Sequence, residues 1–268
     1  MDKRVITTQI SKKARRKFSR VKQQSPNRPQ RVALFLAIIT TVCAVVFTVR
    51  VISYRVDLKR SKHAMSELRE SSYDADMRQI NSDYVGIIKI EGTNIGYPVA
   101  RGDDNEKYLN TTFHGEDNLF GAVFMDYRCT GEYVPHILIY GHNCYDDDGE
   151  WYMFGGLLEF RDEKYLAEHP TILYMENDRV SEYEILTARA TDINDPAYYL
   201  DFNKPNSFAA FLKRNGMPTD AEQVITLSTC IGADNDKRMI VQGVLRGVYP
   251  VELEYDDNGL EMNIQRHS

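Results

Sequence analysis

An uncharged stretch of eighteen residues, Val32 to Val49, divides the chain into two unequal parts, and Arg31 and Arg50 border it. At about 1.5 Å per residue, a helix of this length spans a bilayer core of about 30 Å when its flanking arginines reach the interfaces. A cleavable signal peptide has a shorter apolar region with a small-residue cleavage site close behind it, and residues 50–55 offer neither. The sequence therefore predicts an uncleaved transmembrane anchor over residues 32–52.

Basic residues are concentrated before this stretch. Residues 1–31 contain eleven Lys or Arg and one acid, whereas the rest of the chain contains 22 basic and 38 acidic residues. Positive residues stay on the cytoplasmic side of a membrane helix, so we expect residues 1–31 to form a cytoplasmic arm and the C-terminal domain to face outward. Four basic residues within 55–62 weaken this asymmetry. Anionic lipid headgroups explain the arm better than nucleic acid does.

Residues 53–80 are polar and charged with spaced apolar positions, and they contain neither Gly nor Pro. This pattern predicts a helical stalk, or N-terminal helices that pack on the domain. A solvated coil linker is the alternative.

From Tyr84 onward the pattern changes to short apolar runs broken by turn residues. Eight such runs, several of them alternating, predict a mainly β fold, either a largely antiparallel barrel or a sandwich. The runs are 84–90, 95–99, 122–126, 136–140, 171–175, 183–190, 223–227 and 239–248. Two other segments, Met153–Leu166 and Ser207–Arg214, are predicted to be helices, the second with Ser207 as its cap.

Four cysteines are present, and Cys43 lies within the predicted anchor. Cys129, Cys144 and Cys230 remain for the outer domain, and an odd number leaves at least one thiol free or bonded to another chain. Cys230 closes a strand-like run and precedes loop residues, so a strand supports its thiol while leaving it accessible, as a nucleophile requires. Taken alone, a lone cysteine is more simply a small buried apolar residue.

His142 and Arg238 complete a candidate catalytic group. His142 follows another strand-like run after Gly141, and an imidazole beside Cys230 can take the thiol proton and later protonate a leaving amine. Arg238 opens the last apolar run, and its guanidinium can donate hydrogen bonds to an oxyanion and favour the thiolate. Individually, a surface histidine and a solvated Lys-Arg pair are the simpler interpretations.

The order and context of these three residues resemble the sortase signature. The matching text is Tyr140-Gly141-His142-Asn143, then Thr226-Leu227-Ser228-Thr229-Cys230, then Arg238 before an apolar strand. Further sequence segments resemble the class B branch of that family. They are residues 81–86, 90–93, 97–99, 104–110 and 153–155, and the predicted helix at 207–214 before the cysteine run.

The resemblance implies that residues 81–268 form an eight-stranded sortase β-barrel, with N-terminal helices and a helix in the loop before the cysteine strand. It also implies a two-step transpeptidation of a C-terminal sorting signal. Cys230 attacks the carbonyl of the signal's Thr, His142 protonates the departing amine and deprotonates the incoming one, and Arg238 orients the peptide and offsets oxyanion charge. Candidate residues lining the peptide groove are Ser228, Thr229, Tyr140 and Asn110.

The implied partners are surface proteins that carry a sorting signal, an amine of a cell-wall precursor or a pilin, and membrane lipid around the anchor. Neither nucleic acid nor an organic cofactor is expected. Class B resemblance favours a signal of the Asn-Pro-x-Thr or Ser-Pro-x-Thr type. The sequence leaves open the identity of the acceptor, the balance between transfer and hydrolysis, and the oligomeric state.

Cys144 lies two residues from His142 and allows two interpretations, an inhibitory disulfide with Cys230 or an incidental loop residue, of which the second is simpler. The acidic residues 146–150 lack the alternating ligand spacing of a calcium loop, and no cysteine or histidine pair has zinc spacing, so no metal is expected. An L,D-transpeptidase is disfavoured because Cys230 follows Ser-Thr rather than Ser-His-Gly. A non-catalytic surface β-domain remains the alternative class.

Overall fold

The computed structural model describes residues 27–70, 74–131, 133–146, 148–232, 234–256 and 259–265, with only the backbone of residues 66–70, 74–76, 234–235, 251–256 and 259–263. The chain divides into two compact units, Met1–Val51 and Ile52–Ser268. Most of the predicted basic arm, residues 1–26, lies outside the described residues.

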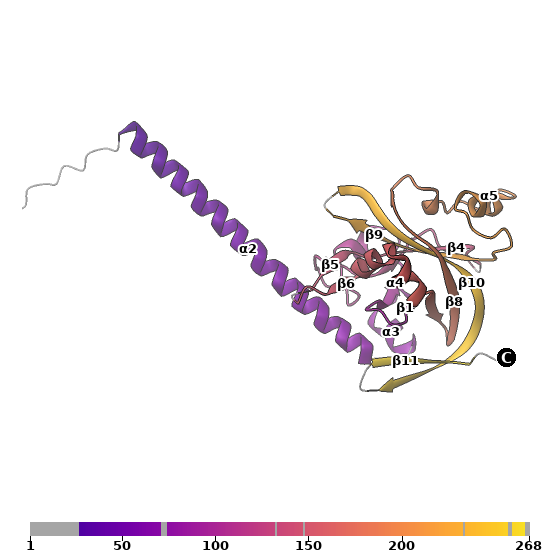
Figure 1. Ribbon diagram of the computed structural model, residues 1–268. Coiled ribbons are helices and arrows are strands. Elements are labelled where there is room, and N and C mark those ends of the chain that lie inside the picture. The colour runs from indigo at the N-terminus through magenta and orange to yellow at the C-terminus, as the bar shows by residue number, and fades with distance from the viewer. Residues whose placement is uncertain are drawn as a thin grey trace, which may run out of the picture. The chain divides into compact units, whose positions relative to one another are not determined.

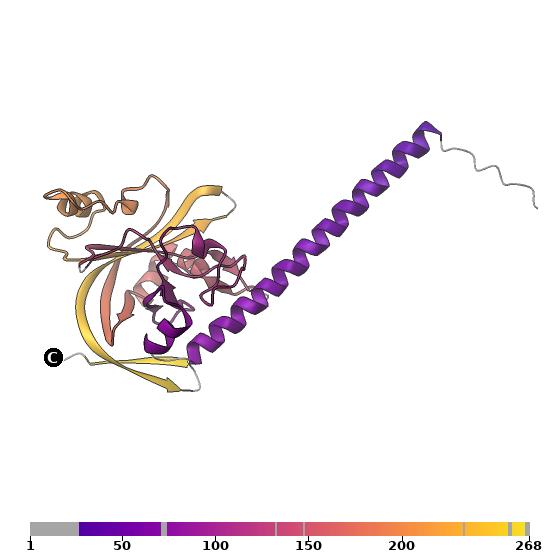
Figure 2. The ribbon, with the colours of Figure 1, turned by 180° about the vertical axis from the view of Figure 1, so that it is seen from behind.

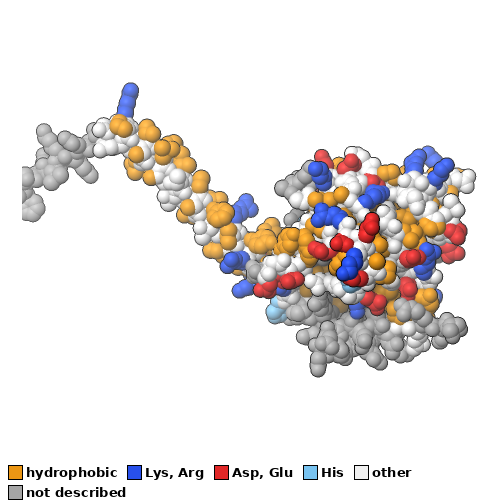
Figure 3. Space-filling model, viewed as in Figure 1, with side chains coloured by type: hydrophobic (Ala, Val, Ile, Leu, Met, Phe, Trp, Pro, Cys, Tyr) orange, Lys and Arg blue, Asp and Glu red, His pale blue; other side chains and the backbone are white. Residues whose placement is uncertain are grey.

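The first described element is α2, a helix of 43 residues from Arg28 to Glu70. An 18-residue window within Arg28–Met65 has a mean hydropathy of 2.7, so this helix is long and apolar enough to cross a membrane. Its apolar side chains are exposed, as at Phe35 and Phe47, and Figure 3 shows them along the helix. The hydroxyl groups of three threonines between residues 40 and 48 donate to backbone carbonyls one turn earlier, which removes free polar groups from this surface.

The end of α2 belongs to the second unit and packs there. Leu58 and Met65 are buried, and between them the buried Ser61 hydroxyl lies 2.7 Å from the Tyr152 hydroxyl. These positions recur at helical spacing, so one face of the helix is covered. A short helix, α3 (Asp74–Ile80), follows and buries Met77. These are the N-terminal helices of the predicted fold.

Eight strands close into a barrel (Figures 1 and 2). Their order is β10-β8-β7-β1-β2-β3-β4-β9, and β9 pairs back with β10. The β2–β3 and β4–β9 pairs are parallel and the other six are antiparallel, which confirms the predicted eight-stranded fold. The strands are β1 (Tyr84–Ile90), β2 (Gly96–Ala100), β3 (Phe124–Met125), β4 (His136–Tyr140), β7 (Thr171–Glu176), β8 (Arg179–Asp192), β9 (Val224–Ile231) and β10 (Asp234–Asp256).

In the part of the chain that the structure describes, three further strands lie outside the closed barrel, and they were not predicted. The far end of the long strand β10 pairs with β11 (Gly259–Ile264). A small hairpin joins β5 (Asn143–Tyr145) to β6 (Trp151–Met153), directly after the turn that carries His142.

The prediction of one helix over Met153–Leu166 is wrong. The structure has a 3-10 helix, η3 (Phe154–Arg161), and then a separate α4 (Glu163–Glu168). Asp162 interrupts the two with an extended backbone, and its carboxylate accepts hydrogen bonds from two backbone amides of α4. A Cβ on Gly155 would lie 2.7 Å from the Cys144 carbonyl oxygen, so η3 passes too close to β5 for a larger residue.

The helix predicted at Ser207–Arg214 is α5, with the same bounds. Its predicted cap is wrong, because Asn206 precedes the helix in a left-handed conformation and the Ser207 hydroxyl donates to the Lys204 carbonyl instead. Two short 3-10 helices, η2 (Lys107–Leu109) and η4 (Pro196–Tyr198), complete the elements used below.

Alternation along β9 separates the barrel core from a second apolar cluster. Ile225 and Leu227 belong to the main core, whereas Val224 packs with Phe211 and Leu212 of α5. Figures 1 and 2 both place α5 outside the strands. Thr226, Ser228 and Cys230 therefore share the outer face of β9 with Val224.

Candidate active site

Cys230 is the penultimate residue of β9 and is a partly exposed free thiol. Arg238 on β10 is its direct partner in the antiparallel ladder, and regular pairing continues from there to Val244 opposite Val224. Directly opposed residues point to the same face, with Cβ atoms about 4.5–5.5 Å apart. The two strands therefore place the Arg238 side chain on the same face as the thiol, and its Nη1 donates to the Lys237 carbonyl at 3.0 Å.

The turn that carries His142 is tied to the same end of β9. Strand β4 runs parallel to β9 with Tyr140 opposite Ser228, and the Gly141 amide donates to the Ser228 carbonyl at 3.2 Å. The Thr229 hydroxyl donates to the Gly141 carbonyl at 2.7 Å. On the other side of His142, the Asn143 amide group donates to the Cys230 carbonyl at 2.9 Å. The structure thus brings the elements that carry all three predicted catalytic residues together.

A glycine is required at the start of this turn. A Cβ on Gly141 would lie 2.6 Å from the ring of Phe154, the first residue of η3. The close packing of that ring explains why the turn before His142 has no side chain.

The imidazole of His142 has a defined orientation. Its Nε2 atom lies 2.8 Å from the carbonyl oxygen of Leu109, the last residue of η2. A carbonyl oxygen can only accept, so Nε2 carries the hydrogen in this contact, and Nδ1 holds the lone pair of the neutral ring. Asn110, a predicted groove residue, follows Leu109 and is exposed.

The other predicted groove residues all have hydrogen-bond partners. The Tyr140 hydroxyl donates to the Asp126 carboxylate at 2.9 Å, and the Ser228 hydroxyl lies 2.7 Å from the Tyr198 hydroxyl. Thr229 is buried, and its hydroxyl donates a hydrogen bond to the Gly141 carbonyl. Thr229 therefore contributes to the architecture of the turn.

Tyr198 was missed by the sequence analysis. It lies in η4, within the long connection from β8 to β9, and reaches Ser228 two residues before Cys230. Burial raises the pKa of Tyr198 to about 12, while the charge of Arg238 acts in the opposite direction and Cys230 contributes a smaller increase. Tyr198 is thus within electrostatic range of both residues. Its only sequence signal is an aromatic pair after Asp-Pro, which does not point to the cysteine.

Asp126 forms a second unpredicted feature, a buried carboxylate clamp. Its side chain accepts from the Arg128 guanidinium group through two bonds of 2.8 Å and from Asn105 and the Tyr140 hydroxyl at 2.9 Å each. Burial alone would raise the pKa of Asp126, but these hydrogen bonds outweigh it and hold the pKa below its usual range. The clamp fixes β4 just before His142, and it fixes the segment that leads to Leu109.

We expect Asp126→Asn to lower the free energy of unfolding by about 2 kcal/mol at pH 7, because it removes the charge that holds Arg128. The lowered pKa means that the contribution of Asp126 is present above pH of about 4 and is lost as the pH falls further. Guanidinium unfolding of the detergent-solubilised chain, followed by the single tryptophan, Trp151, measures both effects. The control is Glu184→Gln, whose ion pair with Arg246 is about half exposed and should contribute little. A difference from the parent chain that persists unchanged at pH 3 would contradict this account.

Cys144 is not a loop residue, contrary to the sequence interpretation. It lies in β5 opposite Tyr152 and is 9% exposed. Burial raises its pKa to about 12, so its thiol stays protonated and is a poor nucleophile for disulfide exchange. In the described part of the acidic segment, the Asp146 carboxylate pairs with Lys62 and accepts from two backbone amides of its own turn. Among the described residues, no three His, Cys, Asp or Glu side chains are grouped to hold a metal ion.

Comparison with known proteins identifies the family. The Sortase domain model matches residues 88–246. Sortase B of Listeria monocytogenes is 32% identical over an alignment of 184 positions that covers 63% of this chain and 72% of that protein.

Solved structures agree with this match. The crystal structure of sortase B from B. anthracis in complex with AAEK1 has a TM-score of 0.59 and 27% identity, covering 71% of this chain and 98% of that one. The Staphylococcus aureus sortase B–substrate complex has a TM-score of 0.56 and 25% identity, covering 74% and 97%. The closed barrel, the family match and these relatives together show that the chain belongs to the sortase family, in its class B branch.

Proposed function

We propose that this cysteine transpeptidase cleaves a C-terminal sorting signal after its Thr residue and transfers the acyl product to an amine of a cell-wall precursor or a pilin. The observation that carries the proposal is the pairing of Cys230 with Arg238 across β9 and β10, with the His142 turn bonded to both Thr229 and Cys230. Membership of the family supplies the reaction class, and the roles of individual residues are our inference.

In the first step, the Cys230 sulfur forms a thioester with the Thr carbonyl carbon while the peptide bond to the following residue breaks. His142 takes the thiol proton and delivers a proton to the departing amine. Because Nε2 is held by the Leu109 carbonyl, Nδ1 is the ring atom that exchanges this proton. Arg238 donates to the carbonyl oxygen as negative charge develops on it.

In the second step, an acceptor amine attacks the thioester, a new amide bond forms and the thiol is released. His142 removes the proton from the incoming amine. Water in place of the amine gives hydrolysis, so the ratio of transfer to hydrolysis depends on how the acceptor is bound.

We further propose that residues 32–52 anchor the enzyme in the cell membrane, with residues 1–31 in the cytoplasm and the stalk and catalytic domain, residues 53–80 and 81–268, outside. The exposed apolar surface of α2 and the basic residues that precede it support this topology. Protease added to intact cells should remove the catalytic domain. If the catalytic domain were fully protected from protease, the opposite orientation would be correct.

The direct test of the activity is cleavage of quenched peptides with Asn-Pro-Gln-Thr, Ser-Pro-Lys-Thr or Leu-Pro-Glu-Thr cores by the full chain in detergent. We expect cleavage after Thr, with the first or second core preferred to the third, and amide formation when an amine acceptor is added. No turnover of any peptide, with or without acceptor, would replace the proposal with a non-catalytic surface domain.

The Ser228–Tyr198 hydrogen bond gives a prediction for the groove. We expect Ser228→Ala and Tyr198→Phe each to lower kcat/KM by about fivefold to tenfold, because each removes one hydroxyl and leaves the other without its partner, a loss of about 1 kcal/mol. The double variant should lose little more than either single one, since both remove the same contact. Unchanged turnover by Ser228→Ala would remove Ser228 from the groove.

A further inference from the structure

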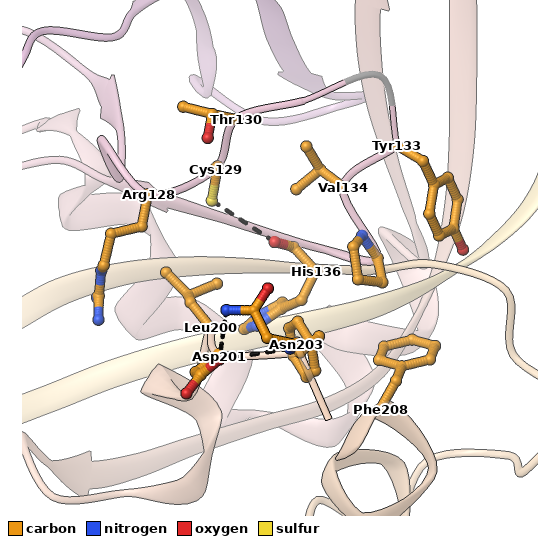
Figure 4. A pocket seen from close by; sticks show the side chains of 12 residues that line it. Arg128, Cys129, Thr130, Tyr133, Val134, His136, Leu200, Asp201, Asn203 and Phe208 are labelled. Atoms are coloured by element: carbon orange, nitrogen blue, oxygen red, sulfur yellow. Dashed lines mark hydrogen bonds between the residues drawn. The ribbon is translucent and has the colours of Figure 1, made fainter. Parts of the chain in front are cut away.

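A cavity of about 690 Å³ lies between the segment before β4 and the connection from β8 to β9. Figure 4 shows Arg128 at one end of it and Tyr133 and Phe208 at the other. Its size is within the range of ligand sites. Its lining combines apolar and aromatic side chains with the polar or charged side chains of Arg128, Thr130, His136, Asp201 and Asn203. The proposed reaction does not use this cavity.

The cavity lies on the same face of the barrel as the Cys230 thiol. His136, which lines it, is the first residue of β4 and pairs with Val224, six residues before Cys230 on β9. The His136 ring bonds to the Thr226 hydroxyl at 2.8 Å, and Thr226 shares the outer face of β9 with Ser228 and Cys230. At about 3.3 Å per residue, the cavity is roughly 20 Å from the thiol along the strand.

The groove residues give the direction of a bound peptide. Tyr140 and Ser228 lie two residues before His142 and Cys230, on the side toward the cavity, and Tyr198 bonds to Ser228 there. If these residues hold the acyl part of the signal, the chain preceding Thr runs from Cys230 toward the cavity. The connection from β8 to β9 also runs toward the cavity. Leu200, which lines the cavity, is two residues after Tyr198.

The length of an extended peptide then determines which residue of the substrate reaches the cavity. With Thr at Cys230, the other three motif residues cover about 10 Å, and roughly 20 Å is reached by the sixth residue before Thr. The cavity is therefore at the distance of the second or third residue before the motif.

The lining decides the chemical class of that residue. Phe202 and Phe208 form an aromatic wall with ring centroids 5.4 Å apart, and Tyr133 is 62% exposed at the rim. Arg128 is already paired with Asp126, and burial lowers the pKa of His136 to about 4, so that ring is neutral. The Asp201 carboxylate accepts from the Asn203 side-chain amide at 2.9 Å. The cavity thus offers aromatic surface, and the charges of Arg128 and Asp201 both have partners within the fold. An aromatic or large aliphatic side chain gains most by leaving water in such a site.

We propose that this cavity binds an aromatic or large aliphatic residue located two or three positions before the sorting motif, and so extends substrate recognition beyond the motif itself. The inference rests on the proposed function of the Cys230 site and adds a specificity site to it. It makes the enzyme selective among surface proteins that carry the same motif.

The test compares peptides of equal length that carry the best cleaved core and differ at those two positions, Phe-Phe against Ala-Ala. With the full chain in detergent, we expect kcat/KM to be about tenfold higher for the Phe-Phe peptide, mainly through KM, because the added contact is the same in the ground and transition states. A control peptide that carries the Phe pair after the cleavage site should show no increase in kcat/KM.

Variants locate the effect. We expect two variants, Tyr133→Ala and Phe208→Ala, each to bring the ratio of kcat/KM for the Phe-Phe peptide to that for the Ala-Ala peptide toward one. Tyr133→Ala changes an exposed side chain. Leu186→Ala, an exposed apolar position on β8 outside the cavity, should keep the ratio. The Cys230→Ala chain should bind the Phe-Phe peptide about tenfold more tightly in fluorescence anisotropy, which reads the cavity without turnover.

Three outcomes would overturn the inference: a ratio near one in the parent chain, a ratio kept by both cavity variants, or a gain from Phe on the downstream side. Cleavage of the Ala-Ala peptide with any of these leaves the proposed function standing. No cleavage of either peptide, with equal binding of both by Cys230→Ala, would overturn the proposed function and this inference together.

Discussion

Cys230→Ala should abolish cleavage of the sorting peptide, with kcat/KM falling at least about 10⁴-fold, to the limit of detection. The thioester cannot form without the sulfur, and the outer end of β9 offers no second nucleophile, since the side chains of Ser228 and Thr229 are buried and hydrogen-bonded. Initial rates with the quenched peptide measure the loss, and circular dichroism checks that the variant is folded.

A matched control for this substitution is Cys43→Ala, which removes another free thiol, in the apolar helix α2. That variant should keep the parent rate within about twofold. If Cys230→Ala retained more than a few percent of the parent kcat/KM, the nucleophile would have to be sought elsewhere in the chain.

Arg238→Ala should lower kcat/KM by about 10² to 10³, which corresponds to about 3–4 kcal/mol for the loss of a donor to an oxyanion. The ladder holds Arg238 directly opposite Cys230, and in the proposed reaction its charge acts where the substrate carbonyl becomes tetrahedral. Arg238→Lys should recover only part of this loss, because an ammonium group does not reproduce the planar fork of donors.

Lys237→Ala is the matched control for Arg238, since it removes the neighbouring exposed cation from the adjacent ladder position. We expect it to change kcat/KM by less than about twofold. Equal losses for both variants would mean that Arg238 acts through the general charge of the strand and has no specific position in the reaction.

Most strands were predictable because they carry strong local patterns, but those patterns left barrel and sandwich open, and the closed barrel was implied by the family resemblance. The apolar runs at β1 and β4 were assigned with their observed bounds, and α5 was found because its segment starts at Ser207 and ends before Asn215-Gly216. The hairpin β5–β6 was missed because three-residue strands carry no periodicity, and so the burial of Cys144 was missed with it. Met153–Leu166 read as one helix because the apolar spacing does not reveal the break at Asp162.

Within the site, the sequence could indicate residues at strand ends but not their partners. Tyr198 bonds to a residue 30 positions away, and Asp126 holds Asn105 from 21 positions away, so neither contact leaves a local pattern. The Leu109 carbonyl is a backbone group, and a side-chain motif cannot report it. These contacts depend on barrel closure and on the path of two long loops, which only the folded chain defines.

The most direct test of the central claim is mass mapping of the covalent intermediate. The full chain is mixed with the best cleaved peptide, quenched in acid within one turnover and digested, and the fragment that carries the added acyl mass is identified. We predict a thioester on Cys230 that ends in the signal's Thr and disappears when an amine acceptor is supplied. An acyl group on Cys129 or Cys144, or product released by the first turnover with no acylated cysteine, would contradict the account.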